Sequence, residues 1–330
     1  MNSEAKILPG IADIRKAAER LEGLLFPTRL IESPALSQKF GGRVLFKPEV
    51  LQRTGTFKFR GAYNKIASLT PEERARGVVA FSSGNHAQGV AAAAAMFGIK
   101  AVIVMPSDAP AIKANNVRAM GAEIVPYDRE TEDREKVAVP YVEKGMALVK
   151  PFDDPAIIAG QGTVGLEIVE ELTERGLSPD LVVTPCGGGG LAAGIATAVK
   201  ALSPETEIWG AEPENFDETR RSLEAGTRLA VEPGHRSICD ALLSPMPGEI
   251  TFAINSKVLS GVIAVSDEAA GQAMRDAAAF LKLVVEPGGS VAFAAIQSGK
   301  LDLSGRTVVV VLSGGNVDLP LYAGIMSRTG

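Results

Sequence analysis

Several residue types that build common active sites are scarce in this chain. Its 330 residues include two histidines, His86 and His235, and two cysteines, Cys186 and Cys239, without a CxxC spacing. So few imidazole and thiol groups exclude a histidine-based zinc site and a disulfide framework. We therefore expect reduced thiols and a cytoplasmic location.

Long hydrophobic runs and clusters of basic residues are also missing. No apolar stretch approaches the ~20 residues that a membrane-spanning helix needs, and the first ten residues lack the apolar core of a signal peptide. The net charge of −5, without a basic run, argues against nucleic acid or a membrane surface as a partner. Apolar residues make up 46% of the chain, which predicts a substantial core in one large domain or two ordinary ones.

Apolar runs of strand length alternate with helical patterns along most of the chain. The patterns predict strands at 78–81, 101–105, 123–125, 181–184, 208–211, 262–265 and 307–312, and helices at 87–97, 111–120, 162–175, 191–202, 217–226 and 267–281. Such alternation is typical of an α/β fold, with helices on both faces of a parallel sheet. A break near 149–155 predicts two lobes.

Three of the predicted strands end in polar loops that contain glycine. These loops are SSGNH at 82–86, the tetraglycine at 187–190 and SGGN at 313–316. Open parallel sheets bind ligands at the carboxyl ends of their strands, so the three loops together indicate one site. The tetraglycine stands between a strand and a helix, where backbone amides face an approaching anion, and it predicts a phosphate site.

A lysine between two phenylalanines adds a candidate nucleophile. Lys58 stands in the segment TFKFRGA, flanked by Phe57 and Phe59. Desolvation by apolar neighbours favours the neutral amine, which is the form that attacks a carbonyl carbon. A phosphate site and a nucleophilic amine together point to a phosphorylated aldehyde, and pyridoxal 5′-phosphate has both groups.

At this point the order of motifs resembles a known family. The chain is similar to the serine/threonine dehydratase and serine racemase group of fold-type II pyridoxal-phosphate enzymes. The matching segments are TFKFRGA from Thr56, SSGNHAQG from Ser82, PAIIAGQGT from Pro155, CGGGGL from Cys186, GAEP from Gly210, VEPGG from Val285 and SGGNVDL from Ser313. The resemblance implies a tryptophan synthase β-like fold of two lobes with open parallel sheets. It also implies a large cofactor-binding domain (1–73 plus 151–330), a small domain (74–150) that closes over the substrate, and a homodimer.

The resemblance also implies roles for residues around the cofactor. Lys58 would bond to the aldehyde and then move the substrate α-proton, while the Asn85 side chain would hydrogen-bond the ring hydroxyl. The tetraglycine, Gly187, Gly188, Gly189 and Gly190, would hold the phosphate. Ser313 would meet the pyridine nitrogen, and a neutral hydroxyl there should favour β-elimination over transamination.

The substrate would be an amino acid bound by the loop that heads the helix at 87–97. Ser82, Ser83, Gly84, Asn85 and His86 would bind its carboxylate. Ser83 matches the serine that acts as an acid and base in racemases; its alternative role is a hydrogen bond without proton transfer.

Arg134 stands in the charged segment TEDREK at 131–136. Its position matches an arginine that faces the side-chain carboxylate of dicarboxylic ligands in racemase-like members. The alternative is an exposed charged loop or the exposed start of a helix.

A divalent cation is the last expectation carried by the resemblance. The segment after GAEP would supply the Glu212 carboxylate, the Phe216 carbonyl and the Glu218 carboxylate. Oxygen ligands suit Mg²⁺ or Ca²⁺. The alternative is an exposed acidic loop.

The implied reaction is β-elimination from L-threonine or L-serine to a 2-oxo acid and ammonia. Serine racemization and dehydration of 3-hydroxyaspartate are alternatives on the same scaffold. Outside the family, the pattern Gly187-x-Gly189-x-x-Ala192 followed by Glu212 is close to a dinucleotide fingerprint and would suit a nicotinamide-dependent oxidoreductase. A protein that binds the cofactor or an amino acid without turnover is a further alternative.

Overall fold

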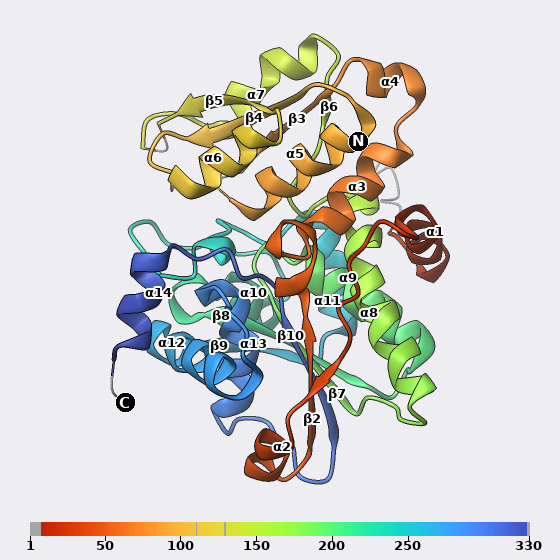
Figure 1. Ribbon diagram of the computed structural model, residues 1–330, viewed down its shortest axis with the longest axis vertical. Coiled ribbons are helices and arrows are strands. Elements are labelled where there is room, and N and C mark those ends of the chain that lie inside the picture. The colour runs from red at the N-terminus through yellow and green to blue at the C-terminus, as the bar shows by residue number, and fades with distance from the viewer. Residues whose placement is uncertain (1–7, 83, 110, 129, 329–330) are drawn as a thin grey trace.

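Two β-sheets organise the chain, one in each part of the molecule (Figure 1). The computed structural model describes residues 8–82, 84–109, 111–128 and 130–328. Within them, the larger sheet has the strand order β1-β2-β10-β7-β8-β9 and the smaller sheet has the order β5-β4-β3-β6. The α/β class with parallel sheets is therefore confirmed.

The smaller sheet is parallel throughout. Its strands are β3 (Val78–Phe81), β4 (Ala101–Pro106), β5 (Glu123–Tyr127) and β6 (Ala147–Leu148). Between them run α5 (Asn85–Phe97), α6 (Ala111–Ala119) and α7 (Arg134–Glu143). All of these elements fall within 74–150, but the domain boundaries themselves stay a prediction.

The larger sheet is parallel except at one edge. Its strands are β1 (Ile31–Glu32), β2 (Arg43–Pro48), β7 (Leu181–Pro185), β8 (Glu207–Pro213), β9 (Gly261–Val265) and β10 (Thr307–Leu312). β1 pairs antiparallel with β2, whereas β2 pairs parallel with β10. The sequence patterns did not predict β1, β2 or β6. β1 and β6 are each two residues long, and β2 contains a buried lysine, Lys47, that interrupts its apolar pattern.

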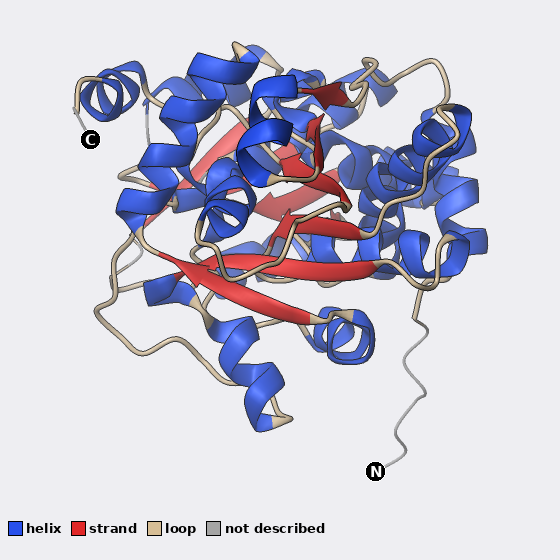
Figure 2. Cartoon of the chain, turned by 90° about the horizontal axis from the view of Figure 1, so that it is seen from below, coloured by secondary structure: helices blue, strands red, loops and turns tan. Residues whose placement is uncertain are grey.

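Helices cover both faces of the larger sheet, as Figure 2 shows from below. The remaining helices are α1 (Ile11–Leu21), α2 (Pro34–Phe40), α3 (Lys58–Ser68), α4 (Pro71–Ala75), α8 (Pro155–Glu174), α9 (Gly190–Leu202), α10 (Glu218–Ala225), α11 (Glu249–Val258), α12 (Asp267–Asp276), α13 (Pro287–Gln297) and α14 (Leu319–Met326). α8 begins before the predicted residue 162, because the Asp154 carboxylate caps the amides of Ala156 and Ile157. In the described part of the chain, no helix has both the length and the apolar character needed to cross a bilayer.

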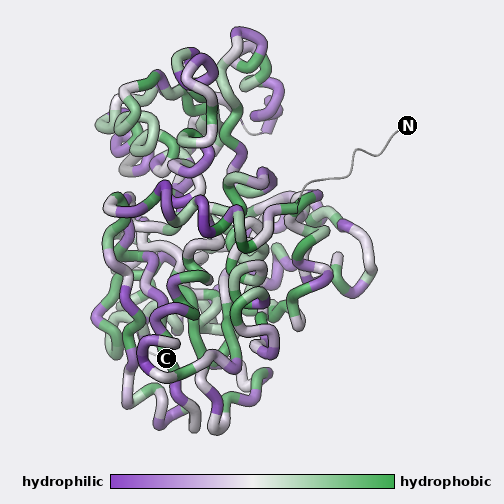
Figure 3. Tube along the Cα trace, turned by 90° about the vertical axis from the view of Figure 1, so that its right-hand side faces the viewer, coloured by the Kyte–Doolittle hydropathy of each residue, from purple (hydrophilic) through white to green (hydrophobic). Residues whose placement is uncertain are grey.

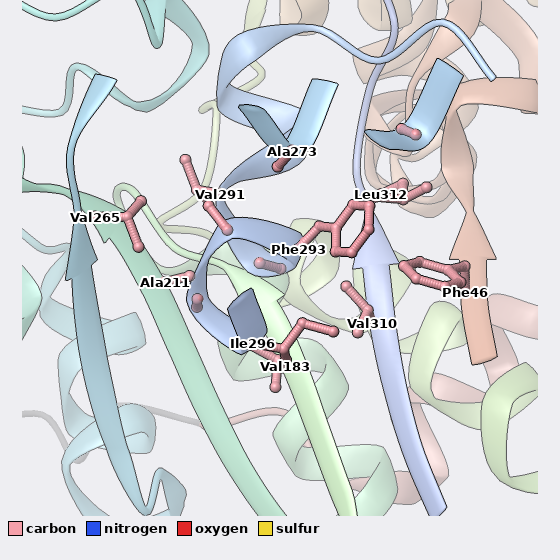
Figure 4. Close-up of a cluster of buried hydrophobic side chains, with 14 of the residues drawn as sticks. Phe46, Val183, Ala211, Val265, Ala273, Val291, Phe293, Ile296, Val310 and Leu312 are labelled. Atoms are coloured by element: carbon pink, nitrogen blue, oxygen red, sulfur yellow. The ribbon is translucent and has the colours of Figure 1, made fainter. Parts of the chain in front are cut away.

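The core of the larger part lies between its sheet and α13 (Figure 4). Phe46 of β2 meets Phe293 of α13 edge to face, with ring centroids 4.9 Å apart. Val183 and Val310, on neighbouring strands, point to the same helix. Burying side chains of this size stabilises the fold by about 1.5–3 kcal/mol each. Figure 3 shows hydrophobic segments running through the middle of both parts.

Candidate active site

A cavity of about 280 Å³ lies where the loops after β3, β7 and β10 come together. It is lined by most of the residues that the motifs singled out: Lys58, Ser82, Gly84, Asn85, His86, Arg134, Gly187, Gly188, Gly189, Gly190 and Ser313. Ser83 lies outside the described residues. The topology explains the convergence, because the carboxyl ends of parallel strands share one edge of a sheet.

Lys58 is the first residue of α3, and its amine lies inside the cavity wall. The Nζ atom donates a hydrogen bond to the Pro151 carbonyl oxygen at 2.8 Å and lies 5.2 Å from the centroid of the Phe57 ring. Burial lowers the pKa of this amine to about 8, against the opposing charge of Glu286. Phe59 instead packs in the core of the smaller part. The amine is thus partly neutral near physiological pH, as a nucleophile or base requires.

The tetraglycine forms the turn from β7 into α9. Gly189 has a φ of 91°, a conformation that residues with a Cβ rarely adopt. At Gly188 an added Cβ would lie 2.4 Å from a ring carbon of Phe152, so only glycine fits. The Thr251 hydroxyl donates to the Gly188 carbonyl at 2.7 Å and steadies the turn. Because the first amides of a helix lack partners within it, this turn suits a phosphate group.

His86 is held as a neutral ring behind the loop that follows β3. Its Nε2 lies 2.8 Å from the Val149 carbonyl oxygen, and its Nδ1 is buried without a hydrogen-bond partner among the described residues. Burial, with the positive charge of Lys58, lowers the pKa of His86 to about 3. His86 therefore stays uncharged near neutral pH and cannot attract a carboxylate by charge.

Asn85 and Ser313, which are predicted to contact the cofactor ring, both line the cavity. Asn85 begins α5, and its amide is tied to Glu286 and Asn316. Ser313 follows β10 and is 5% exposed, and its carbonyl oxygen accepts from the Phe57 amide. Each side chain faces the cavity from a rigid element, which is the geometry that a bound ring needs.

Arg134 reaches the cavity from the first turn of α7. Its guanidinium carbon lies 5.1 Å from the centroid of the Phe81 ring. Both residues line the cavity, together with Tyr127. Arg134 is half-buried and begins α7, so the charged segment leads into the start of a helix, as one of the alternatives expected. That Arg134 faces a substrate carboxylate stays a prediction.

Three charged residues of the cavity were not predicted from the sequence. They are Lys113, Asp240 and Glu286. Glu286 lies in the VEPGG motif, so a signal existed, but nothing in the sequence indicated its partner. Lys113 had no signal, because a lysine in a helical pattern normally lies on the surface.

The two acidic residues expected to bind a cation, Glu212 in β8 and Glu218 at the start of α10, do not line this cavity. Glu212 is fully buried and accepts from the backbone amides of Thr219 and Arg220 at 3.1 and 3.0 Å. Glu218 is also fully buried, and neither of its carboxyl oxygens has a partner among the described residues. Burial raises the pKa of Glu212 to about 8 and that of Glu218 to about 9. In the described chain, no three His, Cys, Asp or Glu side chains group as metal ligands.

Comparison with known proteins supplies independent evidence on this arrangement. Residues 21–314 match the family described as "Pyridoxal-phosphate dependent enzyme". The L-threonine ammonia-lyase of Thermotoga maritima is 42% identical over 96% of this chain and 78% of its own length. The L-threo-3-hydroxyaspartate ammonia-lyase of Saccharomyces cerevisiae is 40% identical over 97% of each chain. The structure of maize serine racemase superposes with a TM-score of 0.90 at 36% identity and covers 97% of each chain.

Proposed function

Because the chain belongs to the pyridoxal-phosphate dependent enzyme family, we propose that it deaminates L-threonine or L-serine by β-elimination. The α-hydrogen and the β-hydroxyl leave as water, and the resulting enamine takes up water to give a 2-oxo acid and ammonia. The family assignment speaks against the nicotinamide-dependent alternative. The relatives of this chain include proteins named as ammonia-lyases and a protein named as a serine racemase, so both kinds of activity occur among its relatives.

One observation carries the proposal: a half-buried amine and a glycine-built turn suited to an anion face the same cavity. Desolvation lowers the pKa of the Lys58 amine, and the tetraglycine lines this cavity together with Ser313 and Asn85. These residues fit pyridoxal phosphate, since each of its polar groups has a matching protein group. When bound, the cofactor withdraws electrons from the substrate α-carbon and makes its hydrogen acidic.

Different protein groups then bind the cofactor, bind the substrate and move the proton. The start of α9 binds the phosphate, and the Asn85 amide and the Ser313 hydroxyl orient the ring. The neutral Lys58 amine takes the α-hydrogen, and its lowered pKa of about 8 leaves it unprotonated often enough to do so. The loop at 82–86 binds the substrate carboxylate through amides and hydroxyls, because His86 is uncharged.

The position of Arg134 favours a second candidate substrate, 3-hydroxyaspartate. Its guanidinium lines the cavity over Phe81, where a substrate side chain would extend. Racemization is the other activity compatible with this site, and it would need Ser83 as the acid and base on the second face of the ring. Product analysis separates the three activities.

A divalent cation would suit the acidic pair of Glu212, in β8, and Glu218, the first residue of α10. Among the described residues, neither carboxyl oxygen of the buried Glu218 has a partner, and burial and the nearby Glu212 raise its pKa. Burial raises the pKa of Glu212 to about 8 and that of Glu218 to about 9, so each is largely protonated near neutral pH, and a hard cation with oxygen ligands would replace those protons. We propose that Glu212, Glu218 and the Phe216 carbonyl hold Mg²⁺ or Ca²⁺.

Closure of the small domain (74–150) over the substrate and homodimer formation also belong to the proposal. Exposed apolar side chains, among them Leu319 of α14 at 71% exposure and Phe280, in the helical turn Ala277–Leu281, at 44%, support association with a second copy. Light scattering of the purified protein measures its mass, and the dimer predicts twice that of the 34.5 kDa chain.

The decisive experiment incubates the purified enzyme with L-threonine, L-serine and L-threo-3-hydroxyaspartate and measures oxo acid and D-serine. We expect Lys58→Ala to abolish product formation, whereas Lys65→Ala, a change on the same helix outside the cavity, should retain it. Borohydride reduction followed by mass spectrometry should place the cofactor on Lys58. Turnover by Lys58→Ala, or an adduct elsewhere, would refute the proposal.

A further inference from the structure

Glu286 is a buried carboxylate to which the proposed reaction assigns no role. It stands directly before α13, is 1% exposed and forms part of the cavity wall. Its Oε1 accepts from Asn85 Nδ2 at 2.6 Å, and its Oε2 has no partner among the described residues. A buried carboxylate with a free oxygen is costly, so its retention beside a cavity indicates a role there.

A series of hydrogen bonds leads to this carboxylate, and in each of them it is determined which group donates and which accepts. It starts at the Thr54 carbonyl, which can only accept, and Asn316 Nδ2 donates to that oxygen at 2.7 Å. The same Nδ2 donates to Asn85 Oδ1 at 2.9 Å. The side-chain amide of Asn85 therefore has its oxygen toward Asn316 and its NH₂ group toward Glu286.

The backbone is constrained where this series begins. Thr54 has a φ of 62° and a ψ of 13°, a left-handed conformation that costs a non-glycine residue roughly 1–2 kcal/mol. An added Cβ on Gly55 would lie 2.6 Å from Asn316 Oδ1, so the amide of Asn316 is packed closely against the turn. Rotation of Asn316, which would reverse the polarity, would place its oxygen against the Thr54 carbonyl.

With its oxygen occupied, Asn85 offers only N–H groups to the cavity. One hydrogen of Nδ2 goes to Glu286, and the other is left for a ligand. Because this N–H group can only donate, it binds a ring oxygen that is ionised and accepts a hydrogen bond more strongly than a ring hydroxyl that must donate one.

We propose that Glu286 is a positioning residue, which holds the Asn85 amide so that its remaining N–H meets the ring oxygen of pyridoxal phosphate. This inference rests on the proposed function, because it assumes that cofactor. Lys58 on α3, Lys113 on α6 and Asp240 in the turn Asp240–Leu242 supply the other charges that act on Glu286. Glu286 thus works through Asn85 and needs no contact with the substrate.

The test measures cofactor affinity instead of turnover. Apoenzyme of the full chain is titrated with pyridoxal phosphate and with its 3-deoxy analogue, which lacks the ring oxygen. For Glu286→Ala we expect about tenfold weaker binding of pyridoxal phosphate, as the loss of one charged hydrogen bond implies. Glu286→Gln keeps the acceptor oxygen, so its affinity should stay within about threefold of the wild type. With the analogue, Glu286→Ala and the wild type should bind alike.

Matched controls separate this role from a structural one. Glu171→Ala removes another buried glutamate, one that pairs with Arg175 outside the cavity, and should leave cofactor affinity unchanged. Asn316→Ala removes the partner on the other side of Asn85. It should weaken binding of pyridoxal phosphate, but not of the 3-deoxy analogue, in the same way. This variant replaces Glu286→Ala in the test if Glu286→Ala does not fold. The inference is overturned if Glu286→Ala binds pyridoxal phosphate with wild-type affinity, or if it loses as much affinity for the 3-deoxy analogue as for pyridoxal phosphate. If Glu286→Ala does not fold, the same two outcomes in Asn316→Ala overturn it. A wild type that fails to bind pyridoxal phosphate would instead refute the proposed function.

Discussion

Lys113 of α6 forms an ion pair with Asp240, and the pair joins the smaller part of the molecule to the larger one across the cavity. The Lys113 side chain is 4% exposed, whereas that of Asp240 is 41% exposed. An added Cβ on Gly84 would lie 3.3 Å from Lys113 Nζ, so the ammonium rests on the loop that is proposed to bind the substrate carboxylate. Asp240 therefore competes with any carboxylate ligand that could reach the Lys113 ammonium from this cavity.

Removing the internal partner of Lys113 should strengthen the binding of dicarboxylates. For Asp240→Asn we expect about tenfold tighter inhibition by succinate, since Lys113 then lacks a competing carboxylate, and for Lys113→Met we expect weaker inhibition. Inhibition constants against L-threonine turnover measure both. Asp302→Asn, an exposed aspartate outside the cavity, is the control. Equal constants in all variants would contradict this assignment.

The pKa of Lys58 predicts how fast apoenzyme takes up its cofactor. Burial lowers this pKa from 10.5 to about 8, and the neutral amine is the form that attacks the aldehyde. The rate of covalent attachment should therefore rise with pH through about 8 and level off above it. Stopped-flow absorbance at saturating pyridoxal phosphate gives the profile. A rate that keeps rising toward pH 10.5 would mean an ordinary lysine.

Gly188 should tolerate no side chain. An added Cβ meets the Phe152 ring at 2.4 Å, so Gly188→Ala should displace the turn and weaken cofactor binding at least tenfold. Adding Phe152→Leu to Gly188→Ala should recover part of the affinity. Gly324→Ala, where nothing lies within 4 Å of the new Cβ, is the control. Unchanged affinity in Gly188→Ala would show that the turn does not hold the phosphate.

Binding of a cation at Glu212 and Glu218 should raise thermal stability. Saturating Mg²⁺ or Ca²⁺ should increase the Tm of the wild type by several degrees over EDTA, because a ligand that binds only the folded state stabilises it. Glu218→Gln should lose this response while it keeps its fold. Differential scanning fluorimetry measures the shift. A wild type that melts alike in metal and in EDTA would exclude the site.

Arg60, in the same helix as Lys58, should contribute strongly to the free energy of unfolding. It is fully buried between Glu49 and Glu167, with a hydrogen bond of 2.8 Å to each Glu49 oxygen. Arg60→Ala removes both of these hydrogen bonds from the buried Glu49 carboxylate, which keeps only Lys47, 4.0 Å away, as an ion-pair partner among the described residues. The change should lower the free energy of unfolding by about 3–5 kcal/mol in urea titrations. The surface pair Arg43–Glu32 is the comparison, and Arg43→Ala should cost less than about 1 kcal/mol. Similar losses in both variants would contradict the argument.

Local patterns were enough to predict the strands and loops on which the site is built. The valines of β10 and the glycines after β7 define their elements through periodicity and backbone freedom, which neighbours along the chain determine. They did not predict β1, or β2 with its buried Lys47. That lysine is accommodated in a buried strand because its ammonium pairs with Glu167 and donates to the Thr28 carbonyl oxygen, and both partners are distant in the sequence.

The amino-acid order alone thus predicted the α/β class and the family, and both are confirmed. It also predicted the phosphate turn and the nucleophilic lysine, which stay predictions. Only the folded chain decided that Glu286 faces Asn85 and that Asp240 reaches Lys113. It also decided that the Glu218 carboxyl is buried with no partner in the part of the chain that the structure describes. The reason is physical: whether a charged side chain is solvated or catalytic depends on burial and on partners that are remote in sequence, and neither leaves a periodic trace.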